Sequence, residues 1–402
     1  MKKKKWLRFR HRVIRNIAYA VLYPYCRIKF GVKVDRFKEQ EKRPYLILLN
    51  HQTTFDQFFV GMSFRGPVYY LATEDIFSLG WISSVLRWLV APIPIKKQTM
   101  DLKAVKTCLR VAEEGGTIAI APEGNRTYSG KTEYMNPAIA SLARKLQLPI
   151  ALYRIEGGYG VQPRWSDVVR KGRMHAYVSR VIRPEEYATL TNDELFSAIE
   201  RGLFVDEAVA DGSFRSQKRA EYLERAIYVC PFCGLSEFES HGHLLSCKSC
   251  GRTVEYGEDK RLSGVGFPFP FSFVSEWYDH QKEVINRLDV MQHCETPLYR
   301  ERVSLDEVVL YKRKQPLRRE AVLSLYGDRL AVDEGGKNPL IFPYSEISAM
   351  SVLGRNKLNL YHEKRVYQIK GGKRFNALKY VHIYFRYKNI SRGDTNGEFL
   401  GL

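Results

Sequence analysis

The chain has 402 residues, of which 45% are hydrophobic, and its 64 basic and 44 acidic side chains give a formal net charge of +20. This composition excludes a disordered chain as the default and fits two or three folded domains, while the charge favours an anionic partner, either nucleic acid or an acidic membrane. The seven cysteines fit a reducing compartment with one metal site better than a secreted disulfide framework.

Residues 1–36 form a strongly basic first segment, with twelve Lys or Arg and one acid. Large apolar residues recur in it at helical spacing from Phe9 to Val21, and arginines fall on the opposite face. Such a basic amphipathic helix can lie in a membrane interface. The alternative is a first helix that packs on the core and keeps its basic face in water. The apolar run Ile17–Tyr25 is about half as long as a transmembrane helix needs, and we expect neither a membrane span nor a secretory signal.

Residues 37–225 alternate short apolar runs with stretches of helical periodicity. This alternation predicts an α/β domain with a mainly parallel sheet and helices on both faces, in which polar motifs lie just past the carboxyl ends of strands. The expected strands are Tyr45–Leu49, Thr117–Ala121 and Pro149–Ile155, and the expected helices are Leu102–Glu114 and Asn136–Lys145.

The most informative stretch, Asn50–Asp56, places a histidine and an aspartate five positions apart, directly after an expected strand. Acyl transfer to an alcohol needs a base, because a hydroxyl is a poor nucleophile until it loses its proton. His51 can take that proton near neutral pH, and the Asp56 carboxylate can hold the other ring nitrogen and stabilise the imidazolium. The pair alone has an ordinary alternative, since an aspartate at such a position often caps a helix or stays a surface charge.

Three further stretches follow this pair. Ala91–Lys97 ends in two cations, Ala121–Thr127 comes directly after an expected strand, and Pro149–Leu152 opens another strand. Together with Asn50–Asp56, their order, spacing and strand-end positions resemble the four blocks of the lysophosphatidate acyltransferase family, the glycerolipid acyltransferases of the 1-acylglycerol-3-phosphate type. The resemblance covers roughly residues 10–215, about half of the chain.

The resemblance implies roles for individual residues. His51 is similar to the family's catalytic base, and Asp56 to the partner that orients it. Pro149 is similar to the proline of the last block, near the acyl chain. Four residues match a Glu-Gly-Thr-Arg block that binds the glycerol and phosphate of the acceptor, with asparagine in place of the threonine: Glu123, Gly124, Asn125 and Arg126.

A second departure concerns the cation block. Lys97 occupies the place where the family usually has an arginine, so that Lys96 and Lys97 replace Asp-Arg. Lysine is a point charge and loses bidentate phosphate recognition, whereas Arg126 keeps the planar fork. We expect Arg126 and Lys97 to bind a phosphate, although either cation alone would ordinarily be a solvated surface charge. The identity of the acceptor stays open.

No serine or cysteine stands in a recognised nucleophile setting, so a direct transfer in a ternary complex is the simplest mechanism, without a catalytic cofactor. The expected donor is acyl-CoA or an acyl-carrier protein, and the expected acceptor is a lysophospholipid or a glycerol phosphate. We expect a peripheral protein on the cytoplasmic face of an anionic membrane, and nucleic acid is not expected as a partner.

Residues 226–256 contain two CxxC knuckles, each followed by glycine and separated by a spacing typical of zinc ribbons. They predict one tetrahedral Zn²⁺ site with four thiolate ligands: Cys230, Cys233, Cys247 and Cys250. A closed site of four cysteines leaves no coordination position open for substrate, so we expect the zinc to be structural. Four thiols without a metal are the alternative. His241 and His243, between the knuckles, are expected to be turn residues.

Residues 257–300 predict a linker and a helix, Glu276–Leu288, and residues 301–402 predict a small, mostly β domain. Phe342–Ile347 and Asn376–Tyr380 resemble parts of a PH or GRAM-like domain, and a plain accessory domain is the alternative. The expected strands of this tail are Val308–Tyr311, Ala321–Leu325, Arg329–Val332, Val366–Ile369 and Val381–Phe385.

The main rival function belongs to a different class: a nucleic-acid- or protein-binding zinc-ribbon protein that carries a non-catalytic acyltransferase-like domain. The net charge and the cysteine knuckles favour it. Nothing in such a function requires His51 five residues before Asp56, and we therefore favour the acyltransferase. A membrane-bound scaffold is a third possibility, against which the same intact pair argues.

Overall fold

A computed structural model of the chain describes residues 5–38, 44–73, 76–77, 80–95, 102–309, 313–394 and 399–401. The chain divides into two compact units, Met1–Pro163 with Val169–Ser216, and Arg164–Val168 with Gln217–Leu402. The finer division expected from the sequence, with boundaries after residues 36, 225, 256 and 300, stays a prediction.

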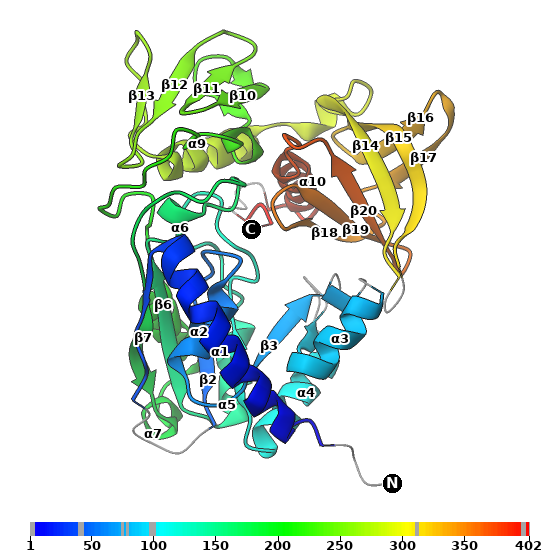
Figure 1. The fold of residues 1–402 in the computed structure, drawn as a ribbon. Coiled ribbons are helices and arrows are strands. Elements are labelled where there is room, and N and C mark those ends of the chain that lie inside the picture. The colour runs from blue at the N-terminus through cyan, green and yellow to red at the C-terminus, as the bar shows by residue number, and fades with distance from the viewer. Residues whose placement is uncertain are drawn as a thin grey trace. The chain divides into compact units, whose positions relative to one another are not determined.

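The first unit is built on a seven-stranded sheet with the order β1-β7-β6-β2-β5-β3-β4 (Figure 1). The five strands from β6 to β4 run parallel, whereas β7 is antiparallel to β6 and β1 is parallel to β7. The mainly parallel sheet is therefore confirmed. The strands are β1 (Val32–Val34), β2 (Leu46–Leu49), β3 (Val68–Thr73), β4 (Ile93–Ile95), β5 (Thr117–Ile120), β6 (Ile150–Glu156) and β7 (Met174–Ile182).

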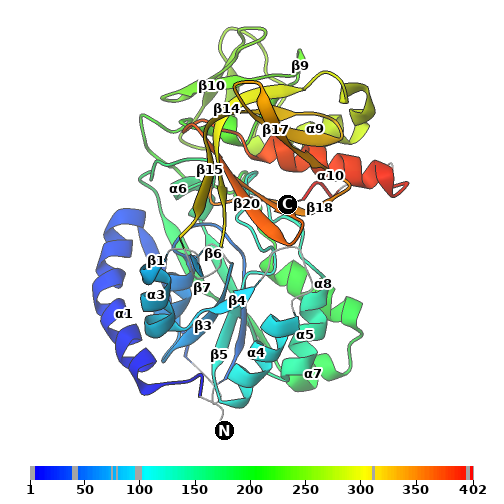
Figure 2. The same ribbon diagram turned by 90° about the vertical axis from the view of Figure 1, so that its right-hand side faces the viewer.

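Helices cover both faces of this sheet, as predicted (Figure 2). Every residue of β2 is buried, because side chains alternate between two faces that are both covered. Leu46 and Leu48 pack on one face with α4, α5, α7 and α8, and Ile47 and Leu49 pack on the other with α1 and α2. The helices are α1 (Phe9–Phe30), α2 (Asp56–Ser63), α3 (Trp81–Val90), α4 (Leu102–Glu113), α5 (Ala138–Leu146), α6 (Gly158–Val161), α7 (Pro184–Ala188) and α8 (Asn192–Leu203).

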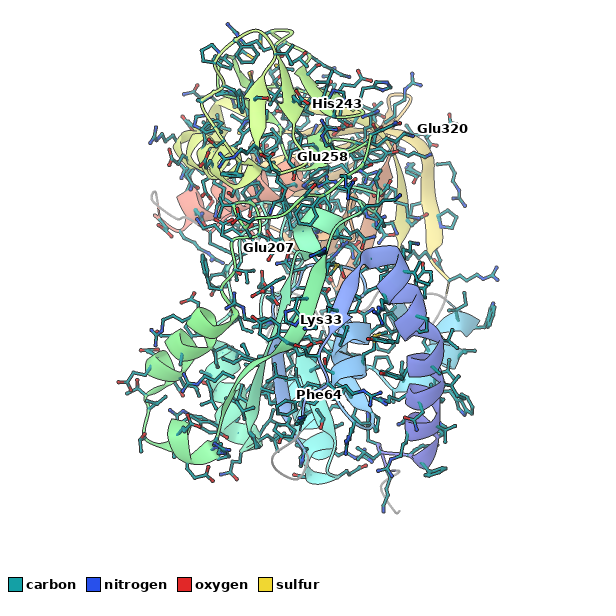
Figure 3. All side chains as sticks on the ribbon, turned by 60° about the vertical axis from the view of Figure 1, so that its left-hand side comes forward. Lys33, Phe64, Glu207, His243, Glu258 and Glu320 are labelled. Atoms are coloured by element: carbon teal, nitrogen blue, oxygen red, sulfur yellow. The ribbon has the colours of Figure 1, made fainter. Side chains whose placement is uncertain are left out.

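Helix α1 turns much of its apolar stripe outward. His11 on its other side is 3% exposed, and the Arg15 guanidinium donates hydrogen bonds to the backbone oxygens of Gly61 and Phe64 in the region of α2. Phe64, which Figure 3 labels, is itself fully buried. The side of the helix that carries His11, Arg15, Cys26 and Phe30 therefore packs on the domain. The most exposed apolar side chains of the stripe are Phe9, Ile17, Val21 and Ile28, at 79%, 60%, 64% and 86%.

Helix α1 ends at a turn that requires a glycine, Gly31. Gly31 has φ +61° and its N–H bonds the carbonyl of Arg27, which closes the helix in the left-handed region. A Cβ atom at Gly31 would stand 2.2 Å from the oxygen of Gly172, so no larger residue fits there. This turn leads directly into β1.

The second unit begins with small sheets that carry the cysteines. The strands β8 (Val229–Cys230) and β9 (Gly234–Leu235) form a hairpin, and an antiparallel sheet follows: β10 (Phe238–His241), β11 (Leu244–Cys247), β12 (Thr253–Tyr256) and β13 (Leu262–Gly264). Helix α9 (Val274–Arg287) corresponds to the expected helix of this region. Its buried Trp277 donates from Nε1 to the Val229 oxygen at 2.8 Å and so ties α9 to the cysteine hairpin.

The tail is mostly β, as predicted, and its seven-stranded antiparallel sheet has the order β17-β16-β15-β14-β20-β19-β18. Helix α10 (Leu378–Ser391) follows the last strand. The strands are β14 (Tyr299–Glu307), β15 (Gln315–Leu325), β16 (Arg329–Glu334), β17 (Lys337–Pro343), β18 (Ile347–Leu353), β19 (Lys357–His362) and β20 (Arg365–Gly371).

Two expected strands of the tail differ from the structure. Val381–Phe385 lies inside α10, so the strand prediction was wrong. The β-branched and aromatic residues there favour a strand locally, but the helix is buried on most sides, and burial overrides that preference. Asn376 caps α10 by accepting from the Leu378 and Lys379 amides. Val308 and Val309 come after β14, and the rest of that expected strand lies outside the described residues.

None of the described helices has both the length and the apolar character that crossing a bilayer demands.

Candidate active site

The candidate active site lies at one edge of the first unit's sheet. β2 ends at Leu49 and leads into Asn50 and His51, and its parallel neighbour β5 ends at Ile120 and leads into the turn that contains Glu123. Because parallel strands have their carboxyl ends at the same edge, the two loops meet there. The backbone N–H of His51 donates to the Glu123 carboxylate at 2.9 Å.

His51 and Asp56 form a hydrogen-bonded pair. The Nδ1 atom of His51 lies 2.7 Å from Oδ2 of Asp56. The His51 side chain is 28% exposed, whereas that of Asp56 is 1% exposed. The Nε2 atom of His51 has no hydrogen-bond partner among the described residues. A carboxylate on Nδ1 selects the tautomer in which Nδ1 carries the proton and Nε2 can accept one.

The Asp56 carboxylate is held in place by local hydrogen-bond donors. It accepts from the backbone N–H of Gln52 at 2.7 Å, from that of Thr53 at 2.9 Å and from the Thr53 hydroxyl at 2.6 Å. Asp56 is also the first residue of α2, where the helix dipole favours negative charge. It is therefore a helix-start residue and a histidine partner at once, so the two readings of the motif do not exclude each other.

Glu123 is buried, with 8% of its surface exposed, and both carboxylate oxygens accept from backbone amides. One oxygen accepts from His51 and the other from Glu133 at 3.1 Å. Burial raises the pKa of Glu123 to about 8, although the two N–H donors act to lower it and the carboxylates of Glu133 and Asp56 act with burial. Its position suits a residue that holds the backbone of His51.

The rest of the matched turn follows Glu123 directly. Gly124 is exposed and has φ +66°, a conformation that favours glycine. Asn125 is half-buried, and Arg126 is 7% exposed. Lys97, the other expected cation, lies outside the described residues. The structure thus brings together His51, Asp56 and the Glu123–Arg126 turn.

Sequence reasoning gave no role to Asn50, which anchors the histidine loop. Its side-chain amide donates to the Ile155 oxygen at 2.9 Å and accepts from the Ile155 N–H at 2.8 Å, across the end of β6. Glu207 acts similarly nearby, where its carboxylate accepts from the Gly157 N–H at 2.6 Å. Asn50 stands beside His51 at a strand end, a signal that could have suggested it. Glu207 lies far along the chain and has no such signal.

The four paired cysteines form a separate cluster in the second unit, and their sulfur atoms all lie within 4.8 Å of one another. The Sγ atoms of Cys230 and Cys250 are 3.8 Å apart, and those of Cys233 and Cys247 are 3.6 Å apart. Tetrahedral zinc with Zn–S bonds of about 2.3 Å places its sulfurs about 3.8 Å apart. The spacing therefore fits a four-thiolate metal site.

Comparison with known proteins gives three kinds of match. The family model "Acyltransferase" matches residues 32–155. A 1-acyl-sn-glycerol-3-phosphate acyltransferase from Bacillus subtilis is 22% identical over 181 residues, which are 44% of this chain and 86% of that protein.

Two solved structures are also similar. The 1-acyl-sn-glycerophosphate acyltransferase PlsC from Thermotoga maritima matches 48% of this chain and 74% of its own, with 17% identity and a TM-score of 0.37. The N-terminal PH domain of human ARAP2 matches 23% of this chain and 81% of its own, with 17% identity and a TM-score of 0.19.

Proposed function

We propose that the protein is an O-acyltransferase of glycerolipids, because residues 32–155 match the acyltransferase family model and a 1-acyl-sn-glycerol-3-phosphate acyltransferase is similar to the chain. It transfers a fatty acyl group from a thioester donor, acyl-CoA or an acyl-carrier protein, to a hydroxyl of a lysophospholipid or glycerol-phosphate acceptor. The observation that carries the proposal is the His51–Asp56 pair, with Nδ1 held at 2.7 Å and Nε2 available to a substrate.

The proposed reaction is a single displacement. Nε2 of His51 takes the proton of the acceptor hydroxyl as its oxygen attacks the thioester carbonyl. The buried Asp56 carboxylate stabilises the imidazolium that forms. Collapse of the tetrahedral intermediate completes the C–O bond and breaks the C–S bond, and the imidazolium returns its proton to the leaving thiolate. No cofactor enters this scheme.

The acceptor's phosphate is proposed to bind at the Glu123–Arg126 turn. Arg126 supplies a planar fork for two phosphate oxygens, and Lys97 supplies a second charge. Because Arg126 is 7% exposed, a phosphate that reaches it would be largely removed from water, where charge-assisted bonds are stronger. Glu123 then contributes by holding the His51 backbone.

The test is acyl transfer by the full chain, with a panel of lysolipids and both donor types and product analysis by mass spectrometry. His51→Ala should lose roughly 10²–10⁴-fold in rate. Its side chain is partly exposed, so the fold should survive, which thermal unfolding can check. Asp56→Asn should also lose activity, but its carboxylate has several donors and some instability is expected. Near wild-type turnover by His51→Ala would refute the mechanism.

We further propose that the first unit lies on the cytoplasmic face of an anionic membrane as a peripheral protein. The support is the outward apolar stripe of α1 and the neighbouring helix α3, whose Trp81 and Trp88 are 68% and 56% exposed. The two helices are in contact, since the Arg10 guanidinium donates to the Trp88 oxygen at 2.9 Å and lies 4.9 Å from its ring. Exposed apolar and Trp side chains beside arginines suit a bilayer interface.

We also propose that the cysteine cluster holds one structural Zn²⁺ through Cys230, Cys233, Cys247 and Cys250. Four thiolates satisfy the metal completely, so the ion would stabilise the ribbon and take no part in acyl transfer.

A further inference from the structure

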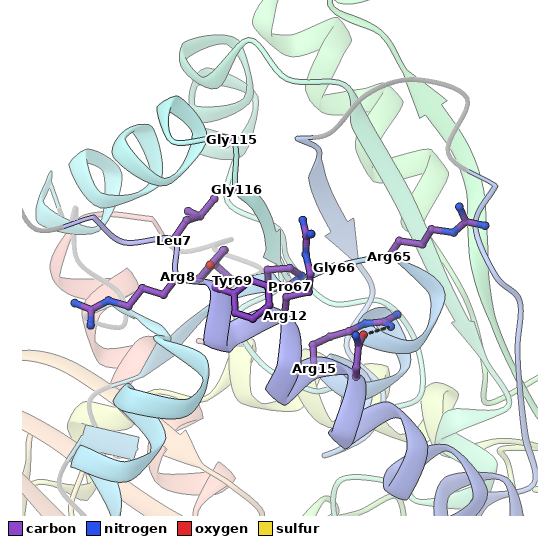
Figure 4. A pocket seen from close by; sticks show the side chains of 12 residues that line it. Leu7, Arg8, Arg12, Arg15, Arg65, Gly66, Pro67, Tyr69, Gly115 and Gly116 are labelled. Atoms are coloured by element: carbon purple, nitrogen blue, oxygen red, sulfur yellow. Dashed lines mark hydrogen bonds between the residues drawn. The ribbon is translucent and has the colours of Figure 1, made fainter.

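A pocket of about 630 Å³ lies in the first unit, away from the candidate active site. Its walls come from the start of α1, from Gly66 and Pro67 before β3, and from Gly115 and Gly116 before β5 (Figure 4). These are the amino ends of two strands. His51 and the Glu123 turn follow the carboxyl ends of β2 and β5, so the pocket lies at the opposite edge of the sheet.

The charge of this pocket is one-signed. Four arginines line it: Arg8, Arg12, Arg15 and Arg65. None of its described lining residues is acidic. The nearest acid along the chain, Glu114, is already engaged, because its carboxylate accepts from the Trp6 and Leu7 amides and from Arg110. One adjacent acid against four arginines leaves the pocket with an excess of positive charge.

The arginines differ in how they are used. Arg15 donates to the backbone of the α2 region and serves the fold. Arg12 and Arg65 are exposed, and neither guanidinium has a hydrogen-bond or salt-bridge partner among the described residues. Figure 4 shows Arg65 and Arg8 extending to opposite sides of the pocket, so a ligand held by both Arg12 and Arg65 requires the Arg65 side chain to turn inward.

The remaining walls are compatible with an anion. A Cβ atom built at Gly115 would meet no atom within 4 Å, which leaves open space at this wall of the pocket. Helix α1 has no acid in its first turn and no side-chain cap, so its amino end adds partial positive charge to this region. Tyr69 lines the pocket, and its hydroxyl contacts Nδ1 of the buried His11 at 3.0 Å. The buried Nε2 of His11 has no hydrogen-bond partner among the described residues.

We propose that this pocket is a second ligand site, distinct from the acyl-transfer site, that binds a phosphate group through Arg12 and Arg65. A phosphate carries about two negative charges at neutral pH and offers three acceptor oxygens, which matches two guanidinium forks. The volume also leaves room for the organic group that carries the phosphate. That group belongs either to a membrane phospholipid or to a soluble phosphate ester.

Two binding experiments on the full chain test the site and separate the sources. Isothermal titration calorimetry with inorganic phosphate probes soluble anions, and co-sedimentation with phosphatidylcholine vesicles, with and without phosphatidic acid, probes a lipid headgroup. Arg12→Gln and Arg65→Gln should each weaken binding about tenfold or more, because each removes a charge-assisted contact. Both side chains are exposed and unpartnered, so these variants should keep the wild-type thermal unfolding midpoint.

The matched control is Arg27→Gln, which removes the same charge from the exposed surface of the same helix, outside the pocket. If Arg12→Gln and Arg65→Gln, but not the control, weaken phosphate binding in the calorimetry, the ligand is a soluble phosphate. If they weaken only the binding to vesicles with phosphatidic acid, the ligand is a lipid headgroup. Phosphate that binds only at Arg126 would be insensitive to both variants. If neither variant differs from Arg27→Gln with any probe, the proposal is wrong.

Discussion

At the scale of single residues, a substitution of Arg126 tests whether the acceptor binds through its phosphate. Arg126→Lys keeps the charge but loses the fork, and kcat/KM for a phosphorylated acceptor should fall roughly 10–150-fold. The KM of the thioester donor should change little. The comparison is with a dephosphorylated acceptor, and Arg201→Lys on the exposed surface of α8 is the control. If kcat/KM falls equally with both acceptors, Arg126 supports the fold and does not bind phosphate. The acceptor would then not be a glycerol phosphate.

Glu123 should make the stability of the first unit depend on pH. Its pKa is raised from the ordinary 4.5 to about 8, so folding favours the protonated form. The stability that this group contributes is full below pH 4.5 and is lost as the pH rises toward 8. The slope should be at most about 1.4 kcal/mol per pH unit.

Glu123→Gln cannot ionise and isolates this effect. The variant loses one amide contact and should be less stable than wild type near pH 5. The difference between their free energies of unfolding should become smaller as the pH approaches 8. Urea unfolding at several pH values, followed by a signal from the first unit, measures both curves. Parallel curves would mean that Glu123 is ionised throughout.

At the scale of elements, the apolar stripe of α1 should carry membrane binding. Ile17→Ser and Val21→Ser remove exposed side chains, so the fold should be unaffected. Each should weaken vesicle binding by about tenfold or more, because burying such a side chain contributes about 1.5–3 kcal/mol. Binding should also fall as salt rises.

Ile341→Ser is the control for α1, because Ile341 is 50% exposed on β17 of the second unit. Co-sedimentation with anionic vesicles compares all three variants. Wild-type binding by the double variant Ile17→Ser/Val21→Ser would exclude this face of α1. The arginines of α1 are a poorer test than the apolar stripe, since Arg15 supports the fold through its bonds to Gly61 and Phe64.

The cysteine ribbon should contain one zinc per chain. Elemental analysis of protein purified without chelators measures the metal, and Cys247→Ser should release it. Since metal binding supplies folding energy at such sites, chelation should also unfold the ribbon. Cys294→Ser is the control, because Cys294 is outside the cluster. A metal content near zero in wild type, or one that Cys247→Ser leaves unchanged, would contradict the zinc proposal.

At the scale of the whole molecule, the amino-acid order alone determined the features that depend on local pattern. Short apolar runs that alternate with helical stretches predicted the parallel sheet, since a strand covered on both faces must be apolar throughout. The strand end before His51 and the spacing to Asp56 predicted a pair that the first turn of α2 closes at 2.7 Å. The two CxxC knuckles predicted the cluster of four sulfurs. Each of these depends on residues that are close in sequence or on a simple period.

The tertiary structure alone decided what depends on distant partners. Glu123 bonds the amide of His51, 72 positions away, so no local pattern could distinguish a backbone support from a substrate ligand. The period of α1 revealed its apolar stripe but not that the stripe faces outward, because direction depends on what the other side packs against. Val381–Phe385 became helical through burial, which outweighs the weak local preference of its residues for a strand.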